Sequence, residues 1–330
     1  MEFTPKYFDP QKAGGVKIDD HGSVSFRAGD QPEDVYVYSA RTILALNVVL
    51  ATRRPLLISG EPGSGKSMLA MNAAALLGCA FYKETVTSKT QAADLLWTFD
   101  TLRRLSDAQT AGQDLLPKQY YVDPGTLWWA FDPETAAQRG VEALPAAHSR
   151  HLAIDPGVMP RRPRSGKAVV LLDEIDKADP DVPNDLLEPF DLKSFTVRET
   201  NDRITAKRET LLILTTNGER ELPQAFLRRC VALTLDPPTA EWFVSIANQK
   251  FGVSDDSLHK EVAREVVRHR DAAKKARLRQ PSTSEYLDAL EACRDLRIDT
   301  GSAVWTDVAR SVLWKNEREP ELEGAAPAQS

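Results

Sequence analysis

Five short segments in the first 240 residues have the length and composition of β-strands. They occupy residues 55–59, 80–86, 168–172, 211–217 and 231–235. The segment 168–172 is apolar throughout, which is typical of a central strand covered on both faces of a parallel sheet. Apolar segments with helical spacing lie between them, at 40–52 and 68–77. The pattern therefore predicts an α/β fold around a parallel five-stranded sheet.

The periodicity changes from strand-like to helical after Asp236-Pro237-Pro238. A double proline interrupts regular structure, so we place a domain boundary there. Four helices are predicted beyond it, the third opened by the capping box Ser282-x-x-Glu285: 239 onward, 255–278, 282 onward and 304–314. The predicted organisation is an N-terminal arm (1–34), an α/β domain (35–238), a helical subdomain (239–317) and a disordered tail rich in Glu, Pro and Ala (318–330).

Residues 87–167 interrupt the α/β pattern with seven prolines and are too long for a plain connection. We interpret them as an insertion with short helices at 94–105 and 135–144. Outside the insertion, the pattern predicts short helices at 184–190 and 222–229 and a hairpin formed by 195–197 with 203–205. The N-terminal arm is predicted to be irregular, with one short strand at 23–26.

A glycine-rich loop follows the first predicted strand. The sequence Gly60-Glu61-Pro62-Gly63-Ser64-Gly65-Lys66-Ser67 matches the phosphate-loop pattern G-x-x-x-x-G-K-[ST] at every position and leads through Met68 into a helix. Glycines let the backbone bend around phosphate oxygens, so that amide groups and the helix N-terminus face the anion. We expect Lys66 to reach the β- and γ-phosphates and Ser67 to ligate Mg²⁺. A glycine-serine turn with an incidental lysine is the alternative.

Polar residues end two of the predicted core strands. Asp173 and Glu174 follow the run 168–172, and Thr215-Thr216-Asn217 ends the run 211–217. We expect Asp173 to hold the magnesium ion through water and Glu174 to polarise an attacking water as general base. The Asn217 amide is suited to hold a water or a γ-phosphate oxygen. The alternatives are that Asp173-Glu174 merely starts a loop and that Asn217 only caps a turn before Gly218.

Composition narrows the class of protein. Of 330 residues, 42% are hydrophobic and 27% charged, ordinary values for a soluble protein, and no apolar run is long enough to cross a bilayer. Three distant cysteines and an N-terminus without a signal-peptide pattern favour a reducing cytoplasm without a disulfide framework. The net charge of −6 argues against coating nucleic acid with the whole surface.

Several weaker signals have an ordinary structural explanation. The two basic clusters are more typical of a solvated face than of a site that contacts phosphates, and the histidine pair lacks further metal ligands. Trp128-Trp129 is expected to be buried. Tyr36 and Tyr38 are better suited to the core than to stacking on a base. The clusters are Arg161, Arg162, Arg164 and Lys167, then Arg268, Arg270, Lys274, Lys275, Arg277 and Arg279; the histidines are His148 and His151.

The order of motifs resembles the MoxR-type branch of the AAA+ ATPases over residues 36 to about 300. The resemblance rests on the phosphate loop, Asp94-Leu95-Leu96, Pro124-Gly125-Thr126-Leu127, Asp173 to Ala178, Thr216-Asn217 and Leu222-Pro223-x-Ala225-Phe226-Leu227-Arg228-Arg229. It implies an AAA+ P-loop core with a C-terminal helical lid, binding of ATP and Mg²⁺, and assembly into a ring, usually a hexamer.

The resemblance also implies roles for single residues. Lys66 and Ser67 match the Walker A pair, Asp173 and Glu174 the Walker B pair, and Asn217 the sensor-1 amide. Arg229 matches the arginine finger that acts on the neighbouring subunit, with Arg228 as the second candidate. Ser284 stands about where the family places a sensor-2 arginine, and Arg277 and Arg279 are the upstream alternatives.

Two further function classes stay open beside a ring-forming ATPase that remodels a protein client. MoxR-type proteins often act on a partner with a von Willebrand factor A domain, and the resemblance suggests such a client here. One alternative is a nucleic-acid-stimulated motor subunit, whose activity would weaken with salt. The other is an ATP-dependent assembly switch in signalling or defence, which the missing sensor-2 arginine keeps open.

Overall fold

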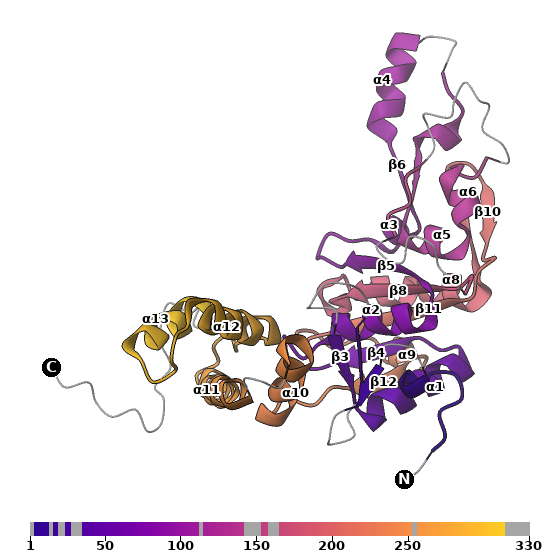
Figure 1. Cartoon of the computed structure of the whole chain (residues 1–330). Helices are drawn as coiled ribbons and strands as arrows, with labels where there is room; N and C mark the ends of the chain where they lie inside the picture. Colours follow the sequence, from indigo (N-terminus) through magenta and orange to yellow (C-terminus); the bar gives the residue numbers. More distant parts are fainter. Residues whose placement is uncertain are drawn as a thin grey trace. The chain divides into compact units, whose positions relative to one another are not determined.

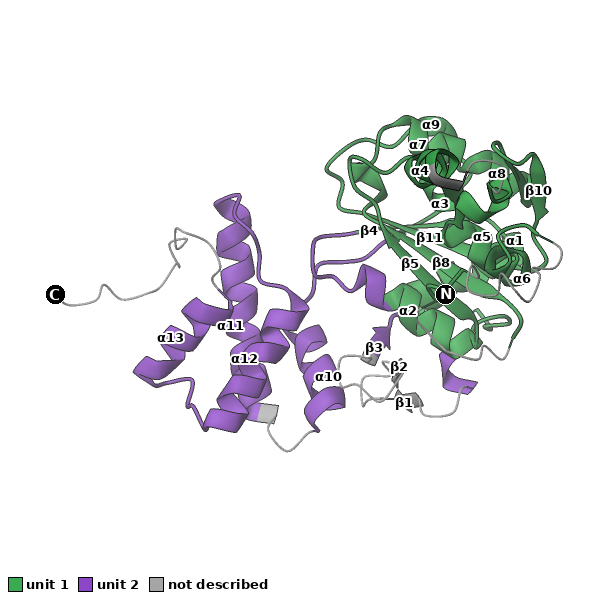
Figure 2. Cartoon of the chain, turned by 90° about the horizontal axis from the view of Figure 1, so that it is seen from above, with its two compact units in different colours: residues 1–9, 40–59, 69–233 green, residues 10–39, 60–68, 234–330 purple. Residues whose placement is uncertain are grey.

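The computed structural model describes residues 3–12, 16–18, 24–27, 35–111, 115–141, 153–157, 165–252 and 256–313 (Figure 1). The chain forms two compact units (Figure 2): residues 1–9, 40–59 and 69–233 make the first, and residues 10–39, 60–68 and 234–330 the second. His148, His151, Arg161, Arg162, Arg164 and the predicted tail 318–330 lie outside the described residues. The predicted domain boundaries at 34, 238 and 317 stay predictions.

A five-stranded parallel sheet forms the centre of the first unit, as predicted. Its strand order is β12 (Val231–Thr234), β4 (Leu56–Ser59), β11 (Thr210–Thr216), β8 (Ala168–Asp173) and β5 (Ala80–Thr85). Residues 169–172 of β8 are fully buried, which explains their uninterrupted apolar sequence.

The register of the sheet brings several strand ends to one edge. Thr216 of β11 pairs with Ser59 of β4, and Thr85 of β5 pairs with Asp173 of β8. Parallel strands place their carboxyl ends together, and ligands of α/β proteins bind at that edge. The phosphate loop begins one peptide bond after Ser59.

Helices follow and precede these strands largely where the pattern predicts them. α1 (Ala40–Thr52) precedes β4, and α2 (Lys66–Leu77) follows the phosphate loop. The predicted helix 184–190 is two short helices, α7 (Asp181–Asp185) and α8 (Leu187–Leu192). The predicted helix 222–229 is only α9 (Gln224–Leu227), because Pro223 disfavours helical backbone at Leu222 and the helix begins after it.

The insertion differs from the prediction at 94–105. That segment is α3 (Ala92–Leu96), the strand β6 (Trp97–Phe99) and the start of α4 (Thr101–Ala111). β6 pairs antiparallel with β7 (Val122–Pro124), and Figure 1 shows α4 beyond this pair. The residues of β6, Trp-Thr-Phe, favour a strand, and the Asp100 side chain accepts a hydrogen bond from the Arg103 amide to restart a helix.

The rest of the insertion packs against the remainder of the first unit through aromatic side chains. It contains the 3-10 turn Lys118–Tyr121, α5 (Thr126–Phe131) and α6 (Pro133–Ala137); beyond Val141, the predicted helix 135–144 lies outside the described residues. Trp128 and Trp129 are buried, as expected. Phe195, in the confirmed hairpin of β9 (Ser194–Val197) and β10 (Asp202–Thr205), stacks on Trp97 with ring centroids 5.7 Å apart and meets Trp128 edge-on.

The described residues of the second unit beyond Thr234 form the helices α10 (Ala240–Phe251), α11 (Asp256–Lys275), α12 (Thr283–Leu296) and α13 (Ala303–Val312). Thr239, Ser282 and Ser302 cap three of them, and the predicted capping box of Ser282 with Glu285 is present. Buried Phe243, Tyr286 and neighbouring apolar residues form the core.

The arm is more regular than predicted. β1 (Val16–Ile18), β2 (Val24–Arg27) and β3 (Val35–Tyr38) make a three-stranded antiparallel sheet, preceded by a 3-10 turn at Pro10–Lys12, and Val37 joins the core of the second unit.

Two further observations concern the apolar content of the helices and the state of the cysteines. Within the described residues, none of the helices combines the length and apolar composition that a bilayer crossing requires. Cys79, Cys230 and Cys293 are buried free thiols, consistent with the predicted absence of a disulfide framework.

Candidate functional site

The phosphate loop has the backbone that its glycines predict. Gly63 and Gly65 adopt φ angles of 76° and 87°, which side chains disfavour. The Lys66 ammonium group donates hydrogen bonds to the carbonyl oxygens of Gly60, at 2.7 Å, and Glu61, at 3.1 Å. Lys66 is 7% exposed, so its cation is held inside the curve of the loop. The buried Ser64 hydroxyl has no hydrogen-bond partner among the described residues.

Gly63 is required for close packing as well as for its φ angle. A Cβ atom at this position would lie 2.7 Å from Cβ of Ser282 and 2.9 Å from its Cα, closer than real Cβ contacts. The Thr283 hydroxyl also donates a 2.6 Å hydrogen bond to the Gly63 carbonyl oxygen. The start of α12 is therefore in direct contact with the loop.

Glu61 makes two ion pairs with α11. Its carboxylate lies 2.9 Å from the Arg270 guanidinium and 2.7 Å from the Lys274 ammonium. Burial raises the pKa of Glu61, but the hydrogen bonds and charges of Lys274 and Arg270 outweigh it and the net pKa is lowered. Arg270 is only 4% exposed. The expectation that its cluster is a solvated face is wrong for Arg270, because this side chain is buried and pairs with the loop carboxylate.

Tyr36 lies against the same loop. Its ring edge is 3.3 Å from where a Cβ atom of Gly65 would stand, so this glycine too leaves room for a neighbour. Tyr36 and Tyr38 meet edge to face with centroids 4.9 Å apart, and both are buried. Burial raises the pKa of Tyr38 well above its ordinary value. The two rings are core side chains, as preferred from the sequence.

Asp173 ends β8 with both carboxylate oxygens engaged. The Thr215 hydroxyl of β11 donates to Oδ1 at 2.5 Å, and the Lys83 ammonium of β5 lies 3.0 Å from Oδ2. The side chain of Asp173 is 13% exposed and that of Lys83 is 40% exposed. Two neighbouring strands thus orient and neutralise this carboxylate.

Glu174 leaves the strand in a left-handed conformation, with φ of 62°. Its amide donates to the Thr215 hydroxyl at 2.9 Å, so Thr215 joins both acidic residues. Its carboxylate accepts hydrogen bonds from the Asn217 amide group, at 3.2 Å, and from the Lys177 ammonium, at 2.7 Å. The hydrogen bond to Glu174 raises the pKa of Lys177. Asn217 therefore contacts Glu174 and does more than cap a turn.

Buried Asp176 fixes the turn that follows β11. Its Oδ2 atom accepts hydrogen bonds from the backbone amides of Asn217, at 3.2 Å, and Glu219, at 2.9 Å. No role was predicted from the sequence for Asp176, Thr215, Lys83 or Lys177. Two of them had a recognisable signal: Thr215 is a hydroxyl residue at the end of an apolar strand, and Asp176 is a second acid two residues after Glu174.

Arg228 and Arg229 stand exposed at the end of α9. The side chain of Arg54 donates hydrogen bonds to the carbonyl oxygens of both residues and so satisfies the end of the helix. The Arg229 guanidinium lies 3.4 Å from the carboxylate of Asp191, with both side chains about half exposed. Within the described part of the chain no ion pair involves Arg228. Both side chains are therefore accessible from the surface of the first unit.

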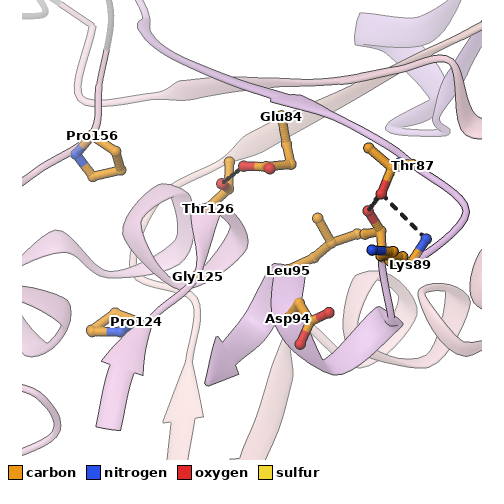
Figure 3. A pocket seen from close by; sticks show the side chains of 10 residues that line it. Glu84, Thr87, Lys89, Asp94, Leu95, Pro124, Gly125, Thr126 and Pro156 are labelled. Carbon is orange, nitrogen blue, oxygen red and sulfur yellow. Dashed lines mark hydrogen bonds between the residues drawn. The ribbon is translucent and has the colours of Figure 1, made fainter. Parts of the chain in front are cut away.

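A separate cavity of about 450 Å³ opens beside β5 (Figure 3). Glu84, Thr87, Lys89, Asp94 and Thr126 contribute polar groups to its lining, and Leu95, Pro124 and Pro156 apolar ones. The Thr126 hydroxyl donates to the Glu84 carboxylate at 3.0 Å, and Thr87 and Thr90 are hydrogen-bonded to each other. The polar groups on its wall thus largely satisfy one another.

Each of the two regions offers groups suited to part of a magnesium-bound triphosphate. In the loop, the buried Ser64 hydroxyl, the Lys66 cation and the curved backbone are suited to phosphate oxygens, and the Ser67 hydroxyl is a hard oxygen ligand. At the end of β8, the carboxylate of Asp173 offers the hard oxygen atoms that Mg²⁺ prefers.

Residues 55–230, more than half of the chain, match the AAA domain family, dynein-related subfamily. The chain belongs to this AAA family. The AAA match covers both the phosphate loop and the strand-end acids. No curated protein is similar enough to count as a relative.

Comparison with solved structures found matches to two of RuvB from Thermotoga maritima. One is the T158V variant, with 14% sequence identity and a TM-score of 0.44, and the other is titled as the RuvB Holliday junction branch migration motor, with 15% and 0.43. Each match covers 82% of this chain and 67% of the RuvB chain.

Proposed function

We propose that this AAA protein is an ATP hydrolase of the MoxR type that assembles into a ring and remodels or activates a protein client. The observation that carries the proposal is the pair Asp173 and Glu174 at the end of β8. Thr215 holds both residues, and Asn217 holds the Glu174 carboxylate. The phosphate loop leaves β4, and β11 lies between β4 and β8 in the sheet.

Each residue has a defined task in this proposal. The loop amides and Lys66 bind the phosphates, and Ser67 with Asp173 holds the magnesium ion. Mg²⁺, when bound, neutralises charge on the phosphate oxygens. Glu174 orients a water and accepts its proton, and Asn217 fixes the carboxylate by its 3.2 Å hydrogen bond. For Asp173 to take the ion, the Lys83 ammonium must give up its place at Oδ2.

The test of this function is hydrolysis by Glu174→Gln. The amide keeps the size of the side chain but no longer accepts the proton, so turnover is expected to fall by about 10²–10⁴-fold. Binding of a fluorescent ATP analogue should stay within a few-fold of wild type. The matched control is Glu188→Gln, at an exposed residue of α8, which should retain full turnover. Equal turnover by Glu174→Gln and wild type would remove Glu174 as the base.

An ATP-dependent assembly switch is the second candidate, and a specific contact favours it. Lys177 lies 2.7 Å from the Glu174 carboxylate and competes with water for it. A switch of this kind binds ATP and assembles with little turnover. Single-turnover hydrolysis on the assembled protein separates the two, because a switch yields less than one product per site over the lifetime of the assembly.

The proposal includes a cytoplasmic ring, most often a hexamer in this branch, and a client with a von Willebrand factor A domain. A nucleic-acid-stimulated motor is less favoured, because Arg270 and Lys274 of the second basic cluster are engaged by Glu61. Turnover measured with and without DNA, at two salt concentrations, distinguishes these clients. Stimulation that weakens with salt would favour the motor.

A further inference from the structure

Two helices of the second unit hold the phosphate loop at neighbouring residues. α11 contacts Glu61 through Arg270 and Lys274, and α12 contacts Gly63 through Thr283. The loop, α11 and α12 all belong to this unit, coloured purple in Figure 2. The loop thus has support on both sides of Pro62 from residues more than 200 positions away in sequence.

The charge of Glu61 opposes the binding of phosphate. This carboxylate stands in a loop whose amides and lysine are arranged for an anion. Its lowered pKa keeps it ionised near neutral pH. One ammonium and one guanidinium group at hydrogen-bonding distance change the local sum of charges from −1 to +1. The two cations therefore remove a repulsion that would otherwise act on a bound triphosphate.

Arg270 also ties the two helices to each other. While one of its nitrogen atoms contacts Glu61, another donates to the carbonyl oxygen of Pro281, just before the cap of α12. Glu285 of the same cap is held by Arg279 at 2.8 Å. The Arg270 guanidinium is thus shared between the loop and the start of α12, and movement of either helix changes its contact with Glu61.

We propose that Arg270 and Lys274 are positioning residues of the phosphate loop, which raise nucleotide affinity by neutralising Glu61 and by coupling the loop to the helical lid. This inference rests on the proposed nucleotide-binding function and deepens it. It assigns the coupling between lid and nucleotide to Arg270 on α11, in a chain that carries Ser284 where a sensor-2 arginine is expected. The cations act through Glu61 and not by direct contact with phosphate.

The test uses the full chain with Arg270→Met, Lys274→Met, Glu61→Gln and the double variant Glu61→Gln/Arg270→Met. Arg264→Met is the matched control, because Arg264 is an exposed arginine of the same helix. Two quantities are measured. Amide hydrogen exchange over residues 60–66 without nucleotide reports on the loop alone, and titration with a fluorescent ATP analogue gives the dissociation constant.

Arg270→Met is expected to speed exchange in the loop and to weaken nucleotide binding by about tenfold, equivalent to about 1.4 kcal/mol. Lys274→Met, at a side chain that is 61% exposed, should weaken binding by a few-fold. Glu61→Gln/Arg270→Met should bind within about threefold of Glu61→Gln, because a neutral side chain needs no compensating cation. A role confined to folding would give no such rescue.

Wild-type exchange and affinity in folded Arg270→Met and Lys274→Met would overturn the inference, as would failure of Glu61→Gln to rescue Arg270→Met. If Arg270→Met does not fold, Lys274→Met decides: wild-type affinity then counts against the inference and weaker affinity supports it. Failure of the proposed function looks different, because the wild-type protein itself would not bind the ATP analogue. In that case unchanged loop exchange in Lys274→Met also rejects the support of the loop by α11.

Discussion

The phosphate loop and the strand-end acids are built in opposite ways. The loop is one contiguous run of backbone, and its supports, Arg270 and Thr283, come from more than 200 residues further along the chain. The acids Asp173 and Glu174 are side chains fixed by Thr215 and Asn217, which come from the adjacent parallel strand about 40 residues away. In the proposed function, nucleotide binding would therefore depend on residues of α11 and α12, and hydrolysis on residues of the sheet.

The largest expected effect comes from Arg229, which belongs neither to the phosphate loop nor to the strand-end acids. It tests whether the loop and the acids alone suffice for turnover. Arg229→Ala is expected to lower kcat by about 10³–10⁵-fold in the assembled protein, because in the proposed ring this cation would stabilise charge on the phosphoryl group transferred in the neighbouring subunit. Turnover is measured well above the assembly concentration. Arg228→Ala is the matched control, with a smaller expected loss. Wild-type rates in Arg229→Ala would contradict the assignment, and a full loss in Arg228→Ala alone would transfer the role to that residue.

Two substitutions test whether nucleotide binding and hydrolysis depend on different residues. Lys66→Met should weaken nucleotide binding by about 10–100-fold, because it removes charge-assisted hydrogen bonds worth about 1.5–3 kcal/mol. Thr215→Val keeps the shape of the residue but releases both Asp173 and Glu174. It should lower kcat by a similar factor while the dissociation constant stays within a few-fold of wild type. The division would be wrong if Thr215→Val lost affinity and kept its kcat.

Acid should weaken the lid through His269, which precedes Arg270 in α11. Burial, with a smaller effect of Arg268, lowers the pKa of His269 to about 4, and its side chain is 5% exposed. Glu265 lies 3.6 Å from the His269 ring and is paired with Arg268 at 2.7 Å. The unfolded chain binds the proton near pH 6.5, so the folded state loses stability as pH falls from 6.5 toward 4.

The expected loss between pH 7 and pH 5 is about 2 kcal/mol in the free energy of unfolding. Urea unfolding of wild type and His269→Gln at both pH values measures it, and the variant should lose clearly less. Equal losses in the two proteins would assign the acid sensitivity to another group.

The smallest effect concerns the metal ion at the strand-end acids. In the proposed site Mg²⁺ would compete with Lys83 for the carboxylate of Asp173, so Lys83→Met should lower the magnesium concentration for half-maximal turnover by up to about fivefold. The expected change in magnesium requirement is small because the Lys83 side chain is 40% exposed, and solvent screens its ion pair with Asp173. Lys89→Met, at an exposed lysine four residues beyond the end of β5, serves as control. A higher magnesium requirement in Lys83→Met would show that Lys83 assists the ion.

The fold and the motifs of the site were largely predictable from the sequence. All five core strands lie within one residue of their predicted ends, and the clearest signal is the continuous apolar run of buried β8. The phosphate loop, Asp173 and Glu174 are contiguous motifs at the ends of such strands. Because Asn217 also ends a predicted strand, it was predicted to lie near Asp173 and Glu174, and its hydrogen bond to Glu174 agrees with that prediction.

The supports of the site were not predictable, and the reason is physical. Arg270 has the spacing of a surface residue on a helix, and only the fold brings it to Glu61 and buries it. Thr215 looks like an ordinary strand residue until β11 pairs with β8. The strand β6 was missed because three residues are too few to show a period, and their pairing with β7 decides their conformation.

The proposed function requires that the phosphate loop and the strand-end acids act on one magnesium-bound nucleotide. The most direct test is a crystal structure of the wild-type chain with a non-hydrolysable ATP analogue and Mn²⁺, located by its anomalous signal. The account predicts one manganese peak held by the Ser67 hydroxyl and by Asp173, directly or through water, with Lys83 displaced from Oδ2. A metal bound to the analogue while Asp173 keeps its ion pair with Lys83 would contradict it.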